Sequence, residues 1–183
     1  KGAALMTGTS YDRVFIDGTA ELLPNYTLEK LMHGCFEEVG VPKCTAEELE
    51  YAAALKATYP PERDVPGIGA KFDAGIAKQV KALSENMTKP VYDFLMPQYS
   101  GEGFRPGSTD VGDVSWQTPT AQIEVAAWPA GVPGHSWQVV ACGKSSMAHK
   151  AMLCAGKVIA SAAIELLEQP ALLEKAKSEF KER

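Results

Sequence analysis

Apolar residues recur at every third or fourth position in four stretches of the chain, and this spacing is typical of amphipathic helices. The predicted helices cover residues 28–39, 45–56, 72–83 and 146–168. Thr27 is the expected N-cap of the first helix, and Gly40 is expected to end it. Residues 1–6 have the pattern of a last helical turn.

Further start signals sharpen two of these elements. Thr45 followed by Glu48 is a capping box, in which the side chain of each residue accepts a hydrogen bond from the backbone N–H of the other. Pro170 favours the first turn of a final helix, where its missing N–H is harmless. The chain is therefore expected to end on a helix that begins at this proline.

Shorter apolar or alternating stretches predict strands at residues 11–17, 91–96, 121–127 and 136–141. Residues 97–110 are rich in Gly and Pro and predict a long loop, which is typical of segments that line a site. Because helices outnumber short strands, the pattern as a whole predicts an α/β layered domain.

Composition narrows the range of partners. The chain has 183 residues, 45% of them hydrophobic and 22% charged, as in an ordinary globular domain. Its formal net charge of −5 gives no electrostatic footprint for nucleic acid or an anionic membrane, and no apolar run is long enough to span a bilayer. We therefore expect neither nucleic acid nor membrane as a partner.

Four cysteines are scattered along the chain without CxxC spacing, namely Cys35, Cys44, Cys142 and Cys154. This usage favours reduced thiols and a cytoplasmic location over a disulfide framework. A cysteine-dependent enzyme is a weak hypothesis, because no motif places a histidine near a cysteine. The chain begins at Lys1 on a helix end, without a signal-peptide pattern, so we expect it to be part of a longer protein.

Candidate chemistry gathers in two Gly-containing segments. Asp110 and Asp113 lie three residues apart, and His135 follows in a Pro-Gly turn. Small residues around acids and an imidazole let backbone approach a metal or polar substrate. The alternative is that Ser108 and Asp110 cap a short helix and that His135 is a surface turn residue. Spacing alone favours this alternative, since no cluster has the spacing of a self-contained metal site.

Several other polar or aromatic residues have two interpretations each. His149 and Lys150 open the long helix near residue 146, Asn25 follows a Leu-Leu-Pro turn, and Trp137 could line an aryl pocket. Capping, turn formation and core packing are the competing explanations. His33 is expected to be structural.

A set of motifs carries a resemblance. They are GSTDVGDVSW at residues 107–116, TPT at 118–120, GHSWQ at 134–138, AHK at 148–150 and QPALLEKAKSEF at 169–180. Together with KGAALMTGT at 1–9 and ELLPN at 21–25, they resemble the C-terminal part of p-aminobenzoyl-glutamate hydrolase-type amidohydrolases. These enzymes belong to the dizinc aminoacylase and carboxypeptidase G family of metallopeptidases.

The resemblance implies a fold and a domain boundary. It implies a three-layer α/β/α, zinc-exopeptidase-like catalytic domain, of which residues 24–183 are the C-terminal portion. Residues 1–23 would be the end of an inserted α+β lid domain, through which a homodimer forms. We expect these first residues to be partly detached, with residues 11–17 as an exposed strand edge.

The resemblance also implies a site. His135 falls where the family has a metal-ligating histidine, for one of two divalent ions, zinc or manganese. Asp110, Asp113, His149, Asn25 and Trp137 become candidates for supporting the metal ligands or lining the substrate channel. His135 and residues 106–118 are expected to face one concave surface at a sheet edge. The family's remaining ligands and its general base lie upstream of Lys1, so no catalytic residue is assigned within this chain.

Two functions follow as hypotheses. The first is a portion of a metal-dependent amidohydrolase that cleaves a small N-acyl or aroyl amino acid amide and is inactive alone. For activity, this portion would need the missing N-terminal segment or a partner chain. Its substrate would be a small-molecule amide. The second is a non-catalytic binding or assembly module of the same fold.

Overall fold

The computed structural model describes residues 1–60, 73–100, 107 and 109–183. Helices are its only regular elements in these parts of the chain. They are α1 (Gly2–Thr7), α2 (Tyr26–Val39), α3 (Ala46–Lys56), α4 (Ala74–Glu85), α5 (Val111–Ser115), α6 (Trp137–Cys142), α7 (Ser146–Glu168) and α8 (Pro170–Glu182). No helix within the described residues has the length and apolar character needed to cross a membrane.

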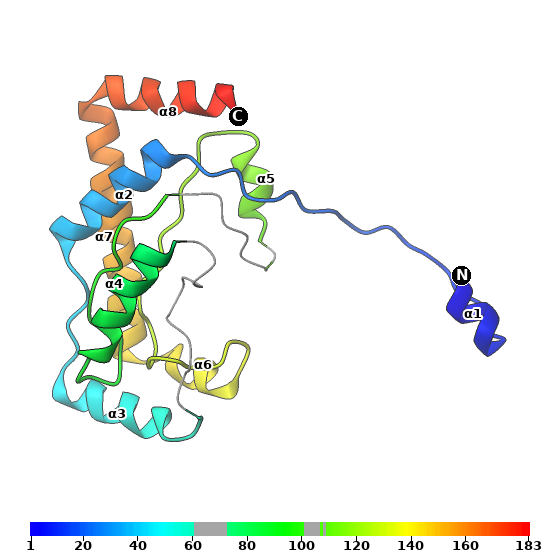
Figure 1. The fold of residues 1–183 in the computed structure, drawn as a ribbon, viewed down its shortest axis with the longest axis horizontal. Coiled ribbons are helices and arrows are strands. Elements are labelled where there is room, and N and C mark those ends of the chain that lie inside the picture. Colours follow the sequence, from blue (N-terminus) through cyan, green and yellow to red (C-terminus); the bar gives the residue numbers. More distant parts are fainter. Residues whose placement is uncertain (61–72, 101–106, 108) are drawn as a thin grey trace.

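The body of the molecule is built on the packing of α2 against the long helix α7. Figure 1 shows the two helices side by side, with α8 lying across one end of the pair. Their contact buries one cluster of apolar side chains, formed by Cys35, Phe36, Cys154, Val158 and Ala162. Val158 and its neighbours are withdrawn from water, which makes this contact the main apolar core of the chain.

A second apolar cluster lies at the other end of α7, where α3 and α6 meet its first turn (Figure 1). Its buried members are Ala52, Leu55, Val91, Cys142 and Met147. Tyr51 of α3 adds a hydrogen bond from its hydroxyl to the carbonyl of Ala141, at 2.9 Å. Helix α7 therefore contributes side chains to both clusters and connects them.

The start signals at Thr45 and Pro170 are confirmed, and α7 has a serine cap. Thr45 and Glu48 form the expected capping box at the start of α3. Ser145 caps α7 by accepting a hydrogen bond from the Ala148 N–H, and Pro170 opens α8.

The predicted cap of α2 was wrong by two residues. Asn25, and not Thr27, accepts the hydrogen bond from the Leu28 N–H, so the helix begins at Tyr26. Asn is as good an N-cap as Thr, and its side chain has a second reason to be buried there, described below. Gly40 ends the helix as expected, with its φ of 75°.

The strand predicted at residues 136–141 was wrong. Ser136 accepts a hydrogen bond from the Val139 N–H and caps helix α6 instead. Gln138 and Cys142, four residues apart, are its buried positions, which is helical spacing. A short apolar run fits both a strand and a buried helix, and the serine cap decides between them here.

Residues 91–96 and 121–127 form no strand in the described structure. They still lie against the α2–α7 pair, because Leu95, Ile123 and Val125 pack on its apolar cluster. Among the described residues, no backbone hydrogen bond joins the first segment to the second. A strand exists only through its ladder with a neighbour, and neither segment forms one within the described residues. The α/β class therefore stays a prediction.

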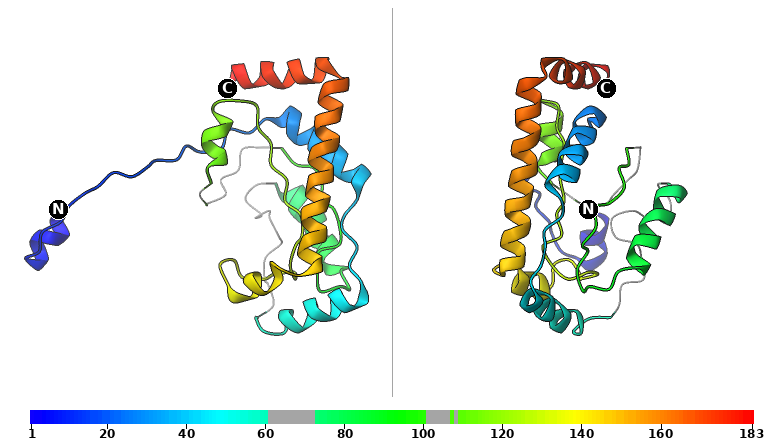
Figure 2. Two further views of the ribbon diagram at one scale, coloured as in Figure 1. Left: turned by 180° about the vertical axis from the view of Figure 1, so that it is seen from behind. Right: turned by 90° about the vertical axis from the view of Figure 1, so that its left-hand side faces the viewer.

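Residues 1–19 leave the body as a separate arm. Helix α1 has no buried residue, and an extended segment connects it to α2 (Figures 1 and 2). Large apolar side chains on this arm are exposed, Ile16 by 91% and Phe15 by 74%. The expected detachment of the first residues is therefore seen. Within the described residues, no backbone hydrogen bond pairs residues 11–17 with another segment, so their assignment to a lid domain stays a prediction.

An ion pair ties α3 to α7. The Glu48 carboxylate, 7% exposed, accepts hydrogen bonds from Lys150 Nζ at 2.7 Å and from the Ser146 hydroxyl at 2.6 Å. It also accepts the Thr45 N–H within the capping box. These hydrogen bonds, above all that from Lys150, lower the pKa of Glu48 from 4.5 to about 2.

We predict that Glu48→Gln destabilises the chain by about 2 kcal/mol at pH 7, because it removes hydrogen bonds to a charged acceptor. The folded pKa of Glu48 is lowered, so its stabilisation is complete above pH 4.5 and is lost as the pH falls toward about 2. Urea unfolding at pH 7 and pH 3 should therefore show a smaller difference between wild type and variant at pH 3. The exposed neighbour Glu47, changed to Gln, is the matched control, and an equal loss in both variants would contradict the role of Glu48.

Candidate functional site

His135 lies in the turn that leads into α6. Its side chain is exposed, and it is the one non-glycine residue with positive φ, 56°, among the described residues. Left-handed backbone is uncommon outside glycine, although histidine adopts it more readily than most residues. Such strain is often found at functional sites, and at His135 it is compatible with both a site and a plain turn.

The two aspartates of the 107–116 motif have different surroundings. Asp110 stands at the N-cap position of α5 but its side chain makes no capping hydrogen bond. Asp113, one turn later, accepts a hydrogen bond from the Ala20 N–H at 3.0 Å, across 93 positions of sequence. The expected short helix is present, but capping by Asp110 is not, and Ser108 lies outside the described residues.

Asp113 is part of a clasp between α5 and residues 20–23, which we call the strap. Ser115 accepts a hydrogen bond from the Leu23 N–H at 2.8 Å, and Trp116 Nε1 donates to the Glu21 carbonyl at 2.8 Å. All three bonds from α5 and its C-cap go to backbone groups of the strap. These hydrogen bonds fix the position of residues 20–23 relative to α5.

Gly112 is needed for this approach. A Cβ atom at residue 112 would lie 2.1 Å from the Ala20 carbonyl oxygen, a distance that only glycine avoids. Gly112, Asp113, Ser115 and Trp116 therefore form the contact surface for the strap. The substrate-channel role of Asp110 and Asp113 stays a prediction.

Asn25 continues the same attachment on the other side of the strap. It is 2% exposed, caps α2, and donates a hydrogen bond from Nδ2 to the Ala176 carbonyl of α8 at 2.9 Å. Glu179 of α8 accepts the N–H groups of Tyr26 and Thr27. Burial raises the pKa of Glu179, but these hydrogen bonds outweigh it and hold the pKa below its ordinary value. The contacts of Asn25 are structural.

His149, in the first turn of α7, and Trp137, at the start of α6, are both exposed. Trp137 is the first residue of α6 and is 61% exposed, so core packing does not explain it. In the AHK motif the residue with a clear role is Lys150, through its ion pair with Glu48.

The structure does not bring the predicted site residues together. Helix α5, which carries Asp113, lies toward the α8 end of α7, whereas α6, which follows His135, lies at the opposite end (Figures 1 and 2). Helix α5 and the turn of His135 are thus apart in the structure, and the expectation that His135 and residues 106–118 face one concave surface stays a prediction. Within the described residues, no three His, Cys, Asp or Glu side chains are grouped to hold a metal ion.

The cysteines lack the surroundings of a nucleophile. All four are free thiols, and burial raises the pKa of Cys35, Cys44, Cys142 and Cys154 above the ordinary thiol value. A raised pKa leaves little thiolate at neutral pH, which is the reactive form. These environments disfavour a cysteine-dependent enzyme.

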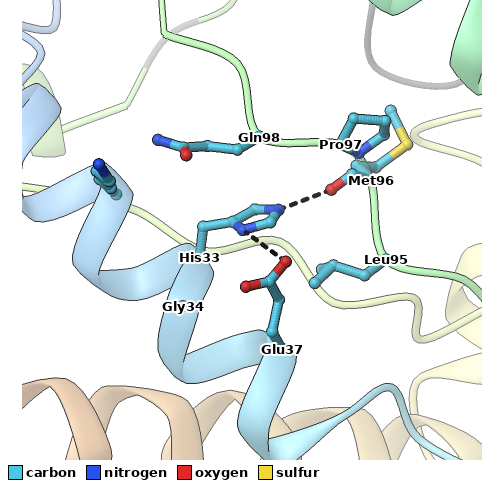
Figure 3. A pocket seen from close by; sticks show the side chains of 8 residues that line it. His33, Gly34, Glu37, Leu95, Met96, Pro97 and Gln98 are labelled. Carbon is cyan, nitrogen blue, oxygen red and sulfur yellow. Dashed lines mark hydrogen bonds and ion pairs between the residues drawn. The ribbon is translucent and has the colours of Figure 1, made fainter.

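A cleft that the sequence did not suggest lies beside α2. It has a volume of about 340 Å³ and is lined by Lys30, His33, Gly34, Glu37, Leu95, Met96, Pro97 and Gln98. Figure 3 shows the His33 ring between α2 and residues 95–98, with Nε2 2.8 Å from the Met96 carbonyl and Nδ1 3.8 Å from Glu37. A carbonyl can only accept, so Nε2 carries the proton in this bond. His33 thus holds an unpaired segment against α2, in agreement with its expected structural role.

Comparison with known proteins shows what the chain is similar to. It is related over its whole length to a hydrolase. The relative is a subunit of the p-aminobenzoyl-glutamate hydrolase of Escherichia coli (strain K12), 34% identical over 185 residues that include all of this chain. The resemblance carried by the motifs is thereby confirmed, and the match is consistent with a C-terminal portion of such a protein. The chain spans 38% of the relative's length. No family model and no solved structure matches it.

We predict that Asp113→Ala increases hydrogen exchange at the Ala20 amide about tenfold, the factor that corresponds to about 1.4 kcal/mol for one hydrogen bond. Ser115→Ala should act in the same way on the Leu23 amide. Both can be measured residue by residue with NMR. Asp110→Ala is the matched control, since Asp110 makes no such bond. Equal exchange in all three variants would show that the clasp does not form in solution.

Proposed function

We propose that the chain is part of a metal-dependent amidohydrolase that cleaves a p-aminobenzoyl-glutamate-like amide. The observation that carries this proposal is the 34% identity over the full chain, because the relative is by name part of a p-aminobenzoyl-glutamate hydrolase. The exposed position of His135, in strained backbone at the start of α6, supports its proposed role as a ligand to one of two zinc or manganese ions.

The described residues do not fit a metal site by themselves. Catalytic zinc sites use three protein ligands and a water, and one exposed imidazole cannot hold a divalent ion tightly. We therefore propose that the other ligands and the general base come from polypeptide equivalent to the rest of the relative. The relative is by name a subunit, which supports a partner chain as one source. Alone, the 183-residue chain is inactive in this proposal.

The alternative is a non-catalytic binding or assembly module. The structure favours it in one respect, because within the described residues the polar motif of α5 binds the strap and not a cavity. The two proposals differ in whether His135 is needed once a complete protein is assembled.

The α/β/α class remains part of the proposal. What supports it is that Leu95, Ile123 and Val125, from residues 91–96 and 121–127, pack on the apolar cluster of the α2–α7 pair, as strands of a layered sheet would. Pairing with strands from further polypeptide would complete that sheet. The free thiols fit the proposed cytoplasmic location.

We propose that the homodimer forms through the arm, by antiparallel pairing of residues 11–17 from two copies. In the register centred on Phe15, each Arg13 lies opposite an Asp17, and each Val14 lies opposite an Ile16. Opposite charges and apolar pairs facing each other stabilise a two-stranded contact. The exposure of Phe15 and Ile16 leaves this segment accessible to a second copy.

The arm proposal predicts a charge-swap result. Arg13→Asp alone should place like charges opposite each other and shift the chain toward monomer, whereas the double variant Arg13→Asp with Asp17→Arg should restore the dimer. Light scattering coupled to size exclusion measures the mass directly. A monomeric wild type, or a dimer indifferent to Arg13→Asp, would rule out this register.

The catalytic proposal predicts hydrolysis only by the assembled protein. The chain combined with polypeptide equivalent to the rest of the relative should release glutamate from p-aminobenzoyl-glutamate and lose this activity with a chelator. His135→Ala should lower the rate at least about a hundredfold, since it removes a ligand of the metal that polarises the amide. Lys144→Ala, an exposed change in the turn between α6 and α7, should leave the rate unchanged.

Three results would contradict the catalytic proposal. Chelator-sensitive hydrolysis by the purified chain alone would show that its own residues suffice. Tight stoichiometric zinc or manganese binding by the chain alone, measured by calorimetry, would show that its own residues suffice to hold the metal. Normal activity of assembled His135→Ala would remove this residue from the mechanism.

A further inference from the structure

The outer side of α7 has the composition of a buried surface. Between residues 152 and 167 its exposed positions are Met152, Leu153, Gly156, Lys157, Ile159, Ala160, Ala163, Ile164 and Leu167. Lys157 is the single charged residue among them. The large apolar side chains are well exposed, from 52% for Ile159 to 81% for Leu167.

The solvent-exposed positions of helix α8, by contrast, are mostly charged. Its exposed positions include Glu174, Lys175, Lys177, Lys181 and Glu182. A helix that is apolar all round is normally buried on all sides. Because the inner side of α7 already packs on α2 through Cys154, Val158 and Ala162, its outer side is a second apolar surface.

Within the described residues, residues 39–43 border this side at Leu153 and Lys157, and its large apolar side chains remain exposed. Figure 2 shows α7 along one outer side of the molecule, with α2 on its inner side and open space beyond it. The outer side also carries small residues in helical register, Gly156, Ala160 and Ala163, and a Cβ atom at residue 156 would meet nothing within 4 Å. Small residues in such a row let the backbone of a second element approach closely.

We propose that the outer side of α7 is the docking surface for the polypeptide equivalent to the rest of the relative, a step that rests on the proposed function. The chain spans 38% of that relative, so most of such a protein remains to be placed against it. The occupant presents an apolar, charge-poor helix or sheet face to α7. At its rim it presents a carboxylate to Lys157, the one charge on this side.

The experiment titrates the purified chain with the part of the E. coli relative that the match leaves out, using isothermal calorimetry. We expect a one-to-one complex that Ile159→Glu weakens at least tenfold, because a carboxylate would be buried without a partner. Leu167→Glu is a second variant on the same side. Ala171→Glu, an exposed apolar-to-acidic change on α8, is the matched control and should bind as wild type. Far-UV circular dichroism checks that each variant is folded.

Binding that is absent, or that Ile159→Glu leaves unchanged, overturns the proposal. A chain that self-associates or binds phosphatidylglycerol vesicles, with Ile159→Glu abolishing either, also overturns it and assigns another occupant. A complex that depends on α7 but does not cleave p-aminobenzoyl-glutamate supports the surface and contradicts the proposed function. Cleavage that is insensitive to Ile159→Glu supports the function and contradicts the surface.

Discussion

The structure depends on the packing of α2 against α7. Val158 is fully withdrawn from water at this contact, and burying one such side chain contributes about 1.5–3 kcal/mol. Residues 91–96 and 121–127 form no strand within the described part of the chain, and they pack on this pair through Leu95, Ile123 and Val125. Because α7 also reaches the cluster formed with α3 and α6, its loss would separate the two halves of the body.

The strap attaches the start of the chain to the body of the molecule. Residues 20–23 are held by α5, and the next residues are held by α8 through Asn25 and Glu179. The arm before them has no comparable contact, and α1 is fully outside the body. The boundary between attached and free chain thus falls near Thr19, a few residues before the boundary that the resemblance implied.

Helices were predictable from the sequence because their signals are local. Thr45 with Glu48, Gly40 and Pro170 each act within one turn of the element they begin or end. Strands were not predictable in the same way, because a strand forms only by pairing with another segment, and a local sequence pattern does not identify that segment. The pattern of residues 136–141 fitted two structures, and a single serine cap made it a helix.

The candidate site was predictable only in its residues and not in its arrangement. Motif resemblance singled out Asp113, Asn25 and His135, but the partners of the first two, Ala20 and Ala176, lie 93 and 151 positions away in sequence. No periodicity indicates contacts of that range. The cleft at His33 depends likewise on Met96, 63 positions along the chain. His135 is the one of the three whose exposed side chain is left for a role beyond the fold.

The central claim is that this chain brings one metal ligand to a site completed by other polypeptide. Anomalous X-ray scattering from crystals of the assembled protein, collected at the zinc or manganese edge, tests it most directly. The claim predicts a metal position about 2.1 Å from a ring nitrogen of His135, with its other ligands from the added polypeptide. A fully ligated metal site that excludes His135 would contradict it.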